Sequence, residues 1–180
     1  MKRQLFLPTA LGIPVLALML CCGPAVAAAQ QMEHSTPSPS TQLTIKTYEG
    51  KTLTLSPGEL AALPHKSVSV YNAHSKANET YSGVPLADLL SKVGVPLGES
   101  VRGKVFLTGV VASGVDGYGV LYSLAEVDPS IHTGDVIVAD TVDGKKLEKD
   151  GAFKMVSSEE RRPARWVRNL ASISVVKVEP

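Results

Sequence analysis

The sequence predicts an α+β fold in which a mixed β-sheet is accompanied by short helices. Hydrophobic residues make up 44% of the 180-residue chain but aromatic residues only 5%, so valine, leucine, isoleucine and alanine must fill the core. Valine-rich segments of this kind favour strands. Strand and helix patterns also follow one another without the strict alternation that a parallel α/β sheet requires. The length suits a single globular domain.

The N-terminal residues have the pattern of a secretory signal peptide. Lys2 and Arg3 precede an apolar stretch over residues 5–20, and small residues follow at 24–29. This order is typical of exported proteins, and it places the signal peptide at residues 1–29. A membrane anchor and a lipoprotein signal are the alternatives. Prolines interrupt the apolar stretch and no small residue precedes either cysteine, so both alternatives fit less well.

Cleavage of the signal peptide would change the chemistry of the chain. It would remove Cys21 and Cys22, the two cysteines of the sequence, and so leave no thiol, disulfide or cysteine metal ligand. It would also remove Lys2 and Arg3, which leaves 16 basic against 17 acidic residues. The signal peptide predicts a periplasmic or secreted protein. The near-neutral balance predicts that the cleaved protein binds neither nucleic acid nor a membrane surface.

The remaining residues divide into a linker and one domain. Residues 30–42 are rich in Ser, Thr, Pro and Gln and are predicted to be a disordered linker. Strands of the domain, residues 43–180, are predicted at 43–48, 51–55, 66–71, 104–112, 118–124, 136–141, 151–156 and 170–178. Helices are predicted at 57–63, 85–93 and 124–127. Residues 72–80 are predicted to form a polar loop.

The stretch from 104 to 127 is the best-patterned part of the domain. It reads as a buried strand, a tight turn with two glycines, a second strand and a short helix that Ser123 caps. Asp116 and Tyr118 lie in the turn, where two core strands would hold them. One interpretation is a pocket wall in which the Tyr118 hydroxyl donates to a ligand. The alternative is a structural turn in which Asp116 caps the backbone and Tyr118 packs.

Four segments in order resemble the molybdopterin-binding domain of the sulfite oxidase family. They read LTLSPGELAALP, then TYSGVPLADLLSKVGVP, then SGVDGYGVLYSLAEV, and finally VIVADTVDGKKLEKDGAFKMV with RRPARWVRNLASISV. Together they span residues 43–178. The resemblance implies the mixed α+β fold of that family and makes molybdopterin a possible cofactor.

The sequence departs from this family at one functional position. The resemblance implies a cysteine that ligates molybdenum just after the strand at 66–71, but the sequence there reads VYNAHSKANETYSGV. We therefore predict an exported module that binds a small anionic ligand or a partner protein without thiolate-ligated molybdenum. The alternatives are a periplasmic molybdopterin-dependent oxidoreductase with a non-cysteine metal site, which would use a periplasmic redox partner, and a structural domain without a ligand.

The resemblance also indicates a basic segment beside the cofactor. Arginine suits anionic groups because its planar guanidinium donates two parallel hydrogen bonds. An exposed loop paired with its own glutamates, with the tryptophan in the core, is the alternative. The three histidines of the domain show no metal-ligand spacing. The candidate cofactor-binding residues are Arg162, Arg165, Trp166, Arg168, Asp116, Tyr118 and His74.

Overall fold

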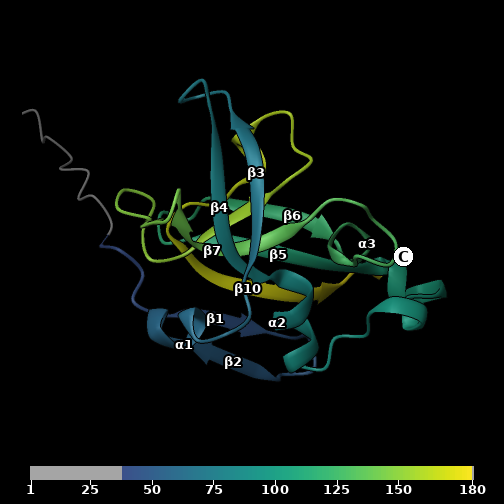
Figure 1. Ribbon diagram of the computed structural model, residues 1–180. Helices are drawn as coiled ribbons and strands as arrows, with labels where there is room; N and C mark the ends of the chain where they lie inside the picture. Colours follow the sequence, from purple (N-terminus) through teal and green to yellow (C-terminus); the bar gives the residue numbers. More distant parts are fainter. Residues whose placement is uncertain (1–37, 180) are drawn as a thin grey trace, which may run out of the picture. The chain divides into compact units, whose positions relative to one another are not determined.

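The computed structural model describes residues 38–179, which form two β-sheets and short helices (Figure 1). The predicted signal peptide and residues 30–37 of the predicted linker lie outside the described residues. Ser40, also within the predicted linker, is buried: its backbone N–H donates to Asn169 Oδ1 at 2.7 Å and its hydroxyl to the Leu170 carbonyl at 2.9 Å.

The first sheet is mixed, as the sequence predicts. Its strands lie in the order β2 (Thr52–Leu55), β1 (Leu43–Lys46), β10 (Leu170–Lys177), β5 (Thr108–Gly114) and β6 (Gly119–Ser123). The β1–β10 pair is parallel, whereas the other three pairs are antiparallel. The last strand of the chain therefore lies at the centre of this sheet, between the first strand and the β5–β6 hairpin.

The second sheet carries a long hairpin. Its strands are β3 (Lys66–Asn72), β4 (Ala77–Pro85), β7 (Val136–Val142) and β8 (Lys145–Lys146), and β9 (Lys154–Ser157) also pairs with β7. All of these pairs are antiparallel. In Figure 1 the β3–β4 hairpin projects upward from the body of the sheet, which places its tip beside the loop that follows β9.

Two of the three α-helices in the described part of the chain begin at a capping serine. The helices are α1 (Pro57–Ala61), α2 (Leu86–Lys92) and α3 (Leu124–Val127), with 3-10 turns η1 (Gly98–Ser100), η2 (Gly103–Leu107) and η3 (Pro163–Arg165). Ser56 and Ser123 each form a capping box with the glutamate three residues later. No helix among the described residues is long and apolar enough to cross a membrane.

The core has two parts because the second sheet is covered on both faces. The larger part lies among the first sheet, one face of the second sheet and the three helices, and includes Leu43, Leu89, Val110, Val138 and Ile173. The smaller part lies on the other face of the second sheet and consists of Val68, Val70, Tyr81, Ile137, Ala139, Leu147, Val156 and Trp166. The smaller part includes Val68, Val70 and Tyr81 of the hairpin, which it connects to β7 and β9.

Two predicted boundaries were wrong. Residues 72–80, predicted as a loop, are mostly the tip of the β3–β4 hairpin, whose pairing continues to Asn72 and Ala77. The side chains there are polar because the hairpin projects into solvent. Residues 104–107, predicted as strand, form η2, so β5 begins only at Thr108. Gly103, with φ +55°, starts this turn in a backbone conformation that favours glycine.

Candidate functional site

A pocket of about 400 Å³ lies beside the tip of the projecting hairpin. The tip of the β3–β4 hairpin, the β5–β6 turn, the segment before β9 and the segment around η3 each contribute to it. Its lining consists of Asn72, His74, Asp116, Tyr118, Asp150, Lys154, Pro163, Trp166 and Arg168. Five of the seven candidate residues from the sequence therefore meet at one place, although they come from three separate parts of the chain.

The β5–β6 turn forms one wall of the pocket. Asp116 Oδ1 accepts a hydrogen bond from the Tyr118 backbone N–H at 3.0 Å, and Gly117 between them has φ +81°. The Tyr118 hydroxyl donates to the Ala164 carbonyl. This bond joins the turn to η3. The hydroxyl proton that one sequence interpretation expected to be donated to a ligand is donated to this carbonyl instead. Tyr118 therefore presents mainly its ring to the pocket.

Lys154, at the start of β9, is the buried cation of the pocket, with only 4% of its surface exposed. Its Nζ donates to the Tyr81 hydroxyl at 2.8 Å and to Asp150 Oδ2 at 2.6 Å. It also lies 4.5 Å from the Tyr81 ring centroid and 5.3 Å from that of Trp166, within cation–π range. An ammonium group has three N–H donors, so these two hydrogen bonds leave one donor for a ligand.

The carboxylate of Glu79, in strand β4 of the hairpin, completes this network. Glu79 accepts hydrogen bonds from Tyr81 at 2.6 Å, Asn72 at 2.8 Å and Ser75 at 2.6 Å. Burial raises the pKa of Glu79, but these hydrogen bonds outweigh burial and the net pKa is lowered. Burial, and then the bond to Glu79, raise the pKa of Tyr81 well above its ordinary value. Tyr81 therefore stays protonated and links the Lys154 ammonium to the Glu79 carboxylate.

Trp166 belongs both to the smaller core and to the pocket. It is 4% exposed, its Nε1 donates to the Ser157 carbonyl at 3.0 Å, and its ring meets that of Tyr81 edge-on at 5.6 Å. The sequence offered a cofactor contact and a core position as alternatives. The structure shows the core position and also places the residue in the pocket lining, and the cofactor contact stays a prediction.

The arginines of the basic segment lie in different places. Arg168 lines the pocket, is 74% exposed at its side chain and has its Nε 4.0 Å from Asp150 Oδ1. Arg165 lies outside the lining: it pairs with Glu126 at 2.9 Å and Glu160 at 3.0 Å, and its guanidinium stacks 4.3 Å from the Tyr122 ring centroid. The local pairing that the sequence left as an alternative therefore applies to Arg165.

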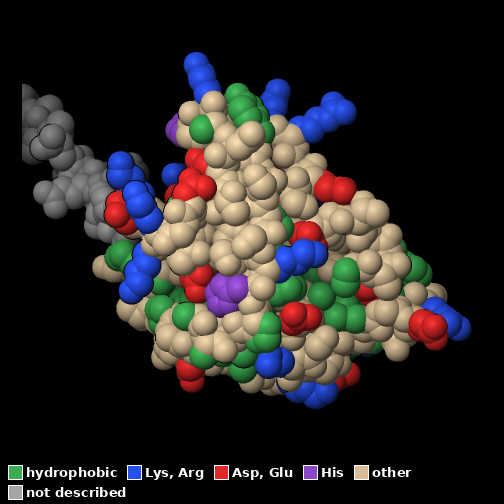
Figure 2. Space-filling view, in the orientation of Figure 1, with side chains coloured by type: hydrophobic (Ala, Val, Ile, Leu, Met, Phe, Trp, Pro, Cys, Tyr) green, Lys and Arg blue, Asp and Glu red, His purple; other side chains and the backbone are tan. Residues whose placement is uncertain are grey.

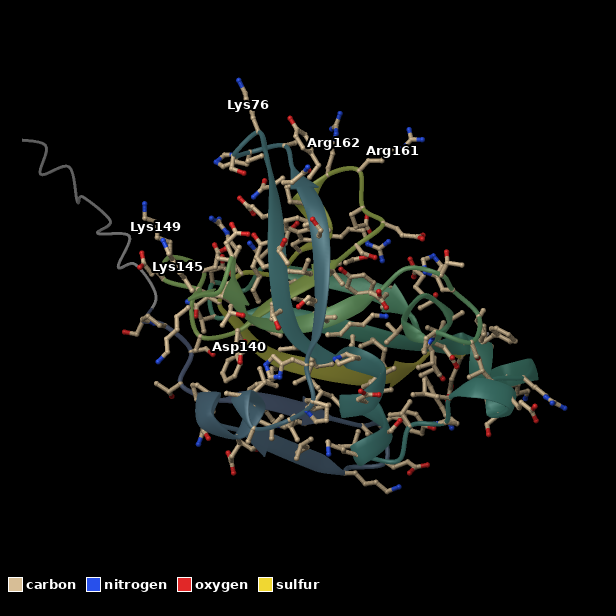
Figure 3. All side chains as sticks on the ribbon, viewed as in Figure 1. Lys76, Asp140, Lys145, Lys149, Arg161 and Arg162 are labelled. Atoms are coloured by element: carbon tan, nitrogen blue, oxygen red, sulfur yellow. The ribbon has the colours of Figure 1, made fainter. Side chains whose placement is uncertain are left out.

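Arg162 also lies outside the lining, near the pocket rim. Figure 3 shows Arg161 and Arg162 projecting into solvent beside Lys76, which lies at the hairpin tip. Figure 2 shows the same group of basic side chains at the top of the view. None of the three forms an ion pair with another described residue. We call Lys76, Arg161 and Arg162 the basic rim.

The histidines occupy separate positions. His74 lines the pocket from the hairpin tip, where its backbone N–H donates to Asn72 Oδ1 at 2.9 Å. His65 pairs with Asp140 and His132 with Glu159, each away from the pocket. The histidines therefore do not converge, in agreement with their spacing in the sequence.

Sequence reasoning missed four pocket residues: Asn72, Asp150, Lys154 and Pro163. Lys154 offered one signal, because a charged residue stands inside the apolar pattern of the predicted strand at 151–156. Asp150 offered none, since its role depends on the ion pair with Lys154. The two residues are four positions apart, but outside a helix this spacing does not by itself predict an ion pair.

The donor set does not fit a thiolate-ligated molybdenum centre. A site of this type uses a soft thiolate ligand. No cysteine occurs among residues 38–179, since both cysteines of the chain lie at 21 and 22. No group of three or more His, Cys, Asp and Glu side chains in the described part of the chain is arranged to hold a metal ion. The pocket instead offers one buried ammonium, one guanidinium and two aromatic rings.

The comparisons with known proteins concern the fold. No protein-family model and no curated protein matches the sequence. The structure is similar to the crystal structure of the sulfane dehydrogenase SoxCD from Paracoccus pantotrophus, with a TM-score of 0.58 and 18% identity. The match covers 77% of this chain but 39% of the SoxCD chain, less than half of that protein. The described residues therefore share the fold of the matched part of that protein, with mixed β-structure and short helices, as the sequence predicted.

Proposed function

We propose that this chain is an exported module that binds a small anionic ligand in the Lys154 pocket, without thiolate-ligated molybdenum. The observation that carries the proposal is the Lys154 ammonium, which is buried at the pocket floor and keeps one N–H free. A buried charge is stable only where it is paired and hydrogen-bonded, so an anion at the third donor would complete its coordination.

Other lining residues suit the same ligand. Arg168 lines the pocket and its side chain is exposed. Its planar guanidinium is able to donate two parallel hydrogen bonds to an oxyanion. Tyr118 and Trp166 supply ring surface, which favours a flat anion such as a pterin carboxylate over a compact inorganic one. The basic rim lies close enough to attract anions from solution before they reach the pocket.

A direct binding measurement tests the proposal. Trp166 is the single tryptophan of the chain, so its fluorescence reports occupation of the pocket. We expect pterin-6-carboxylate to bind saturably by calorimetry and to change this fluorescence, with sulfate as the compact competitor. Arg168→Gln should weaken binding at least five-fold without loss of stability, since its side chain is 74% exposed. Lys46→Gln, far along the first sheet, serves as the control. Equal affinity in both variants would overturn the proposal.

A periplasmic molybdopterin-dependent oxidoreductase is the second candidate. It is favoured by the position of the pocket, which includes Asn72 at the end of β3 and His74 just after it, where the family resemblance implies the metal ligand. Elemental analysis and pterin detection on protein exported from a cofactor-producing host separate the two candidates. Molybdenum and pterin near one per chain would favour the oxidoreductase and direct attention to His74. Absence of both, in folded protein that binds the pterin carboxylate, would favour the ligand module.

A further inference from the structure

A second hollow, of about 410 Å³, lies at the opposite end of strands β5 and β10. The Lys154 pocket adjoins the end of β5 and the start of β10, whereas Thr108 starts β5 and Lys177 ends β10. Six residue steps of about 3.3 Å separate the two ends, so the hollows are about 20 Å apart. The second hollow is lined by Tyr48, Lys104, Val105, Leu107, Thr108, Lys177, Val178 and Glu179, and it shares no residue with the first.

One wall of this hollow is apolar and exposed. Leu107 is 38% exposed and Val178 54%, and the adjacent Phe106 is 48% exposed. The Val178 backbone N–H donates to the Leu107 carbonyl at 2.8 Å, which holds the two sides of this wall together. Apolar side chains grouped at a concave surface gain stability when a ligand removes them from water.

The lining of the hollow also includes two lysines, Lys104 and Lys177. Lys177 Nζ lies 4.1 Å from the Tyr48 ring centroid, and neither Lys177 nor Lys104 forms an ion pair with another described residue. Glu179 is the one acidic residue of the lining. The lining therefore has one more positive than negative group, which suits a ligand with a single negative charge.

Thr108 adds a hydroxyl group to the lining of the hollow. Its side chain is nearly buried, with 3% of the residue exposed, and it lines the hollow. Its hydroxyl forms no hydrogen bond to another residue in the described part of the chain. Asp140 Oδ1, and not this hydroxyl, is the buried side-chain polar atom without a partner among the described residues, so the Thr108 hydroxyl keeps contact with solvent and is able to donate to a ligand that enters the hollow.

We propose that this hollow binds a small amphipathic carboxylate: a single carboxylate group on a short apolar chain. The carboxylate would lie between the Lys104 and Lys177 ammonium groups and accept a hydrogen bond from Thr108. The apolar chain would cover Leu107 and Val178. This site is separate from the Lys154 pocket and does not depend on the function proposed for it.

Titration of the full exported chain with sodium octanoate tests this site by amide NMR. We expect saturable shifts at Tyr48, at residues 104–108 and at 177–179, and weaker binding of 1-octanol. Lys104→Gln combined with Lys177→Gln should weaken octanoate binding at least ten-fold. Lys46→Gln and Arg168→Gln, both outside the hollow, should leave it unchanged.

Thr108→Val distinguishes a ligand contact from a structural role. Valine keeps the shape of threonine, so we expect about three-fold weaker octanoate binding with no fall in the urea midpoint of unfolding. Equal affinity for octanol and octanoate, or unchanged affinity in the double lysine variant, would overturn the site. Concentration-dependent broadening of the same amides without octanoate would also overturn it, because it would identify the surface as a contact between copies of the chain.

Discussion

Replacement of Lys154 by methionine tests the buried network from which the proposed function is argued. Methionine approximates the volume of the lysine stem, so little cavity is created. The variant loses the 2.6 Å ion pair to Asp150 and the 2.8 Å hydrogen bond to Tyr81. Breaking a buried ion pair costs about 3–5 kcal/mol. The Asp150 side chain is 24% exposed and retains some hydration, so we expect a loss of about 2–3 kcal/mol.

Lys66 provides a matched control for this experiment. Its Nζ lies 2.6 Å from Asp135 Oδ1, the same distance as in the Lys154 pair, but the two side chains are 52% and 30% exposed. Exposed pairs of this kind contribute about 0–1 kcal/mol. Lys66→Met should therefore cost less than about 1 kcal/mol. The difference between the two variants isolates the effect of burial from that of ion-pair geometry.

Urea unfolding followed by Trp166 fluorescence measures both variants. With a slope of about 1–3 kcal/mol per molar urea, Lys154→Met should lower the midpoint by about 1 M and Lys66→Met by much less. Asp150→Asn added to Lys154→Met should recover part of the loss, because it removes the uncompensated carboxylate. Equal midpoints for Lys154→Met and the unsubstituted protein would refute the reasoning. So would equal losses in Lys154→Met and Lys66→Met.

Three further substitutions test other parts of the fold. Gly83→Ala would place a Cβ 2.2 Å from the Val138 carbonyl oxygen at the β4–β7 pairing; it should lower stability by about 3 kcal/mol, and an unchanged urea midpoint would contradict this packing. Burial lowers the pKa of His65, but hydrogen bonds to Asp140 and to the Leu63 carbonyl outweigh burial and raise the net pKa. The stabilisation is therefore complete below about pH 6.5 and is lost as the pH rises through the folded pKa; His65→Gln should lower the melting temperature at pH 5.5 more than at pH 8.5, and a uniform effect would be evidence against the pair. Ser123→Ala, which removes the capping box of α3, should cost about 1 kcal/mol in urea unfolding, and no cost would show that packing alone holds that turn.

The sequence predicts best those features whose cause is local. The helix starts at Ser56 and Ser123 depend on side chains three residues away, and the structure contains both capping boxes. The turn at residues 114–118 depends on glycine and aspartate within five residues. The mixed sheet was predicted because strand and helix patterns do not alternate strictly along the chain. The parallel β1–β10 pair, in a sheet whose other pairs are antiparallel, confirms it.

Features that depend on distant residues were not predictable in this way. Lys154 contacts Tyr81 across 73 positions of the sequence, and Arg165 contacts Glu126 across 39. The pairing of Arg165 with the nearby Glu160 was open from the sequence, but its pairing with Glu126 of α3 was not. The polar residues of the hairpin tip were read as a loop, because a strand that projects into solvent has no apolar face to reveal it.

The charges of the Lys154 pocket constrain which ligand it is able to hold. Lys154 and Arg168 oppose Asp116 and Asp150 in the lining, so these fixed charges nearly cancel. A multiply charged anion would gain little from such a lining, whereas a singly charged one would be oriented by the free Lys154 donor. Attraction over longer distances must then come from the basic rim, whose three cations are exposed and unpaired among the described residues. Because exposed charges are screened by salt and buried donors are not, salt should slow association more than it speeds dissociation.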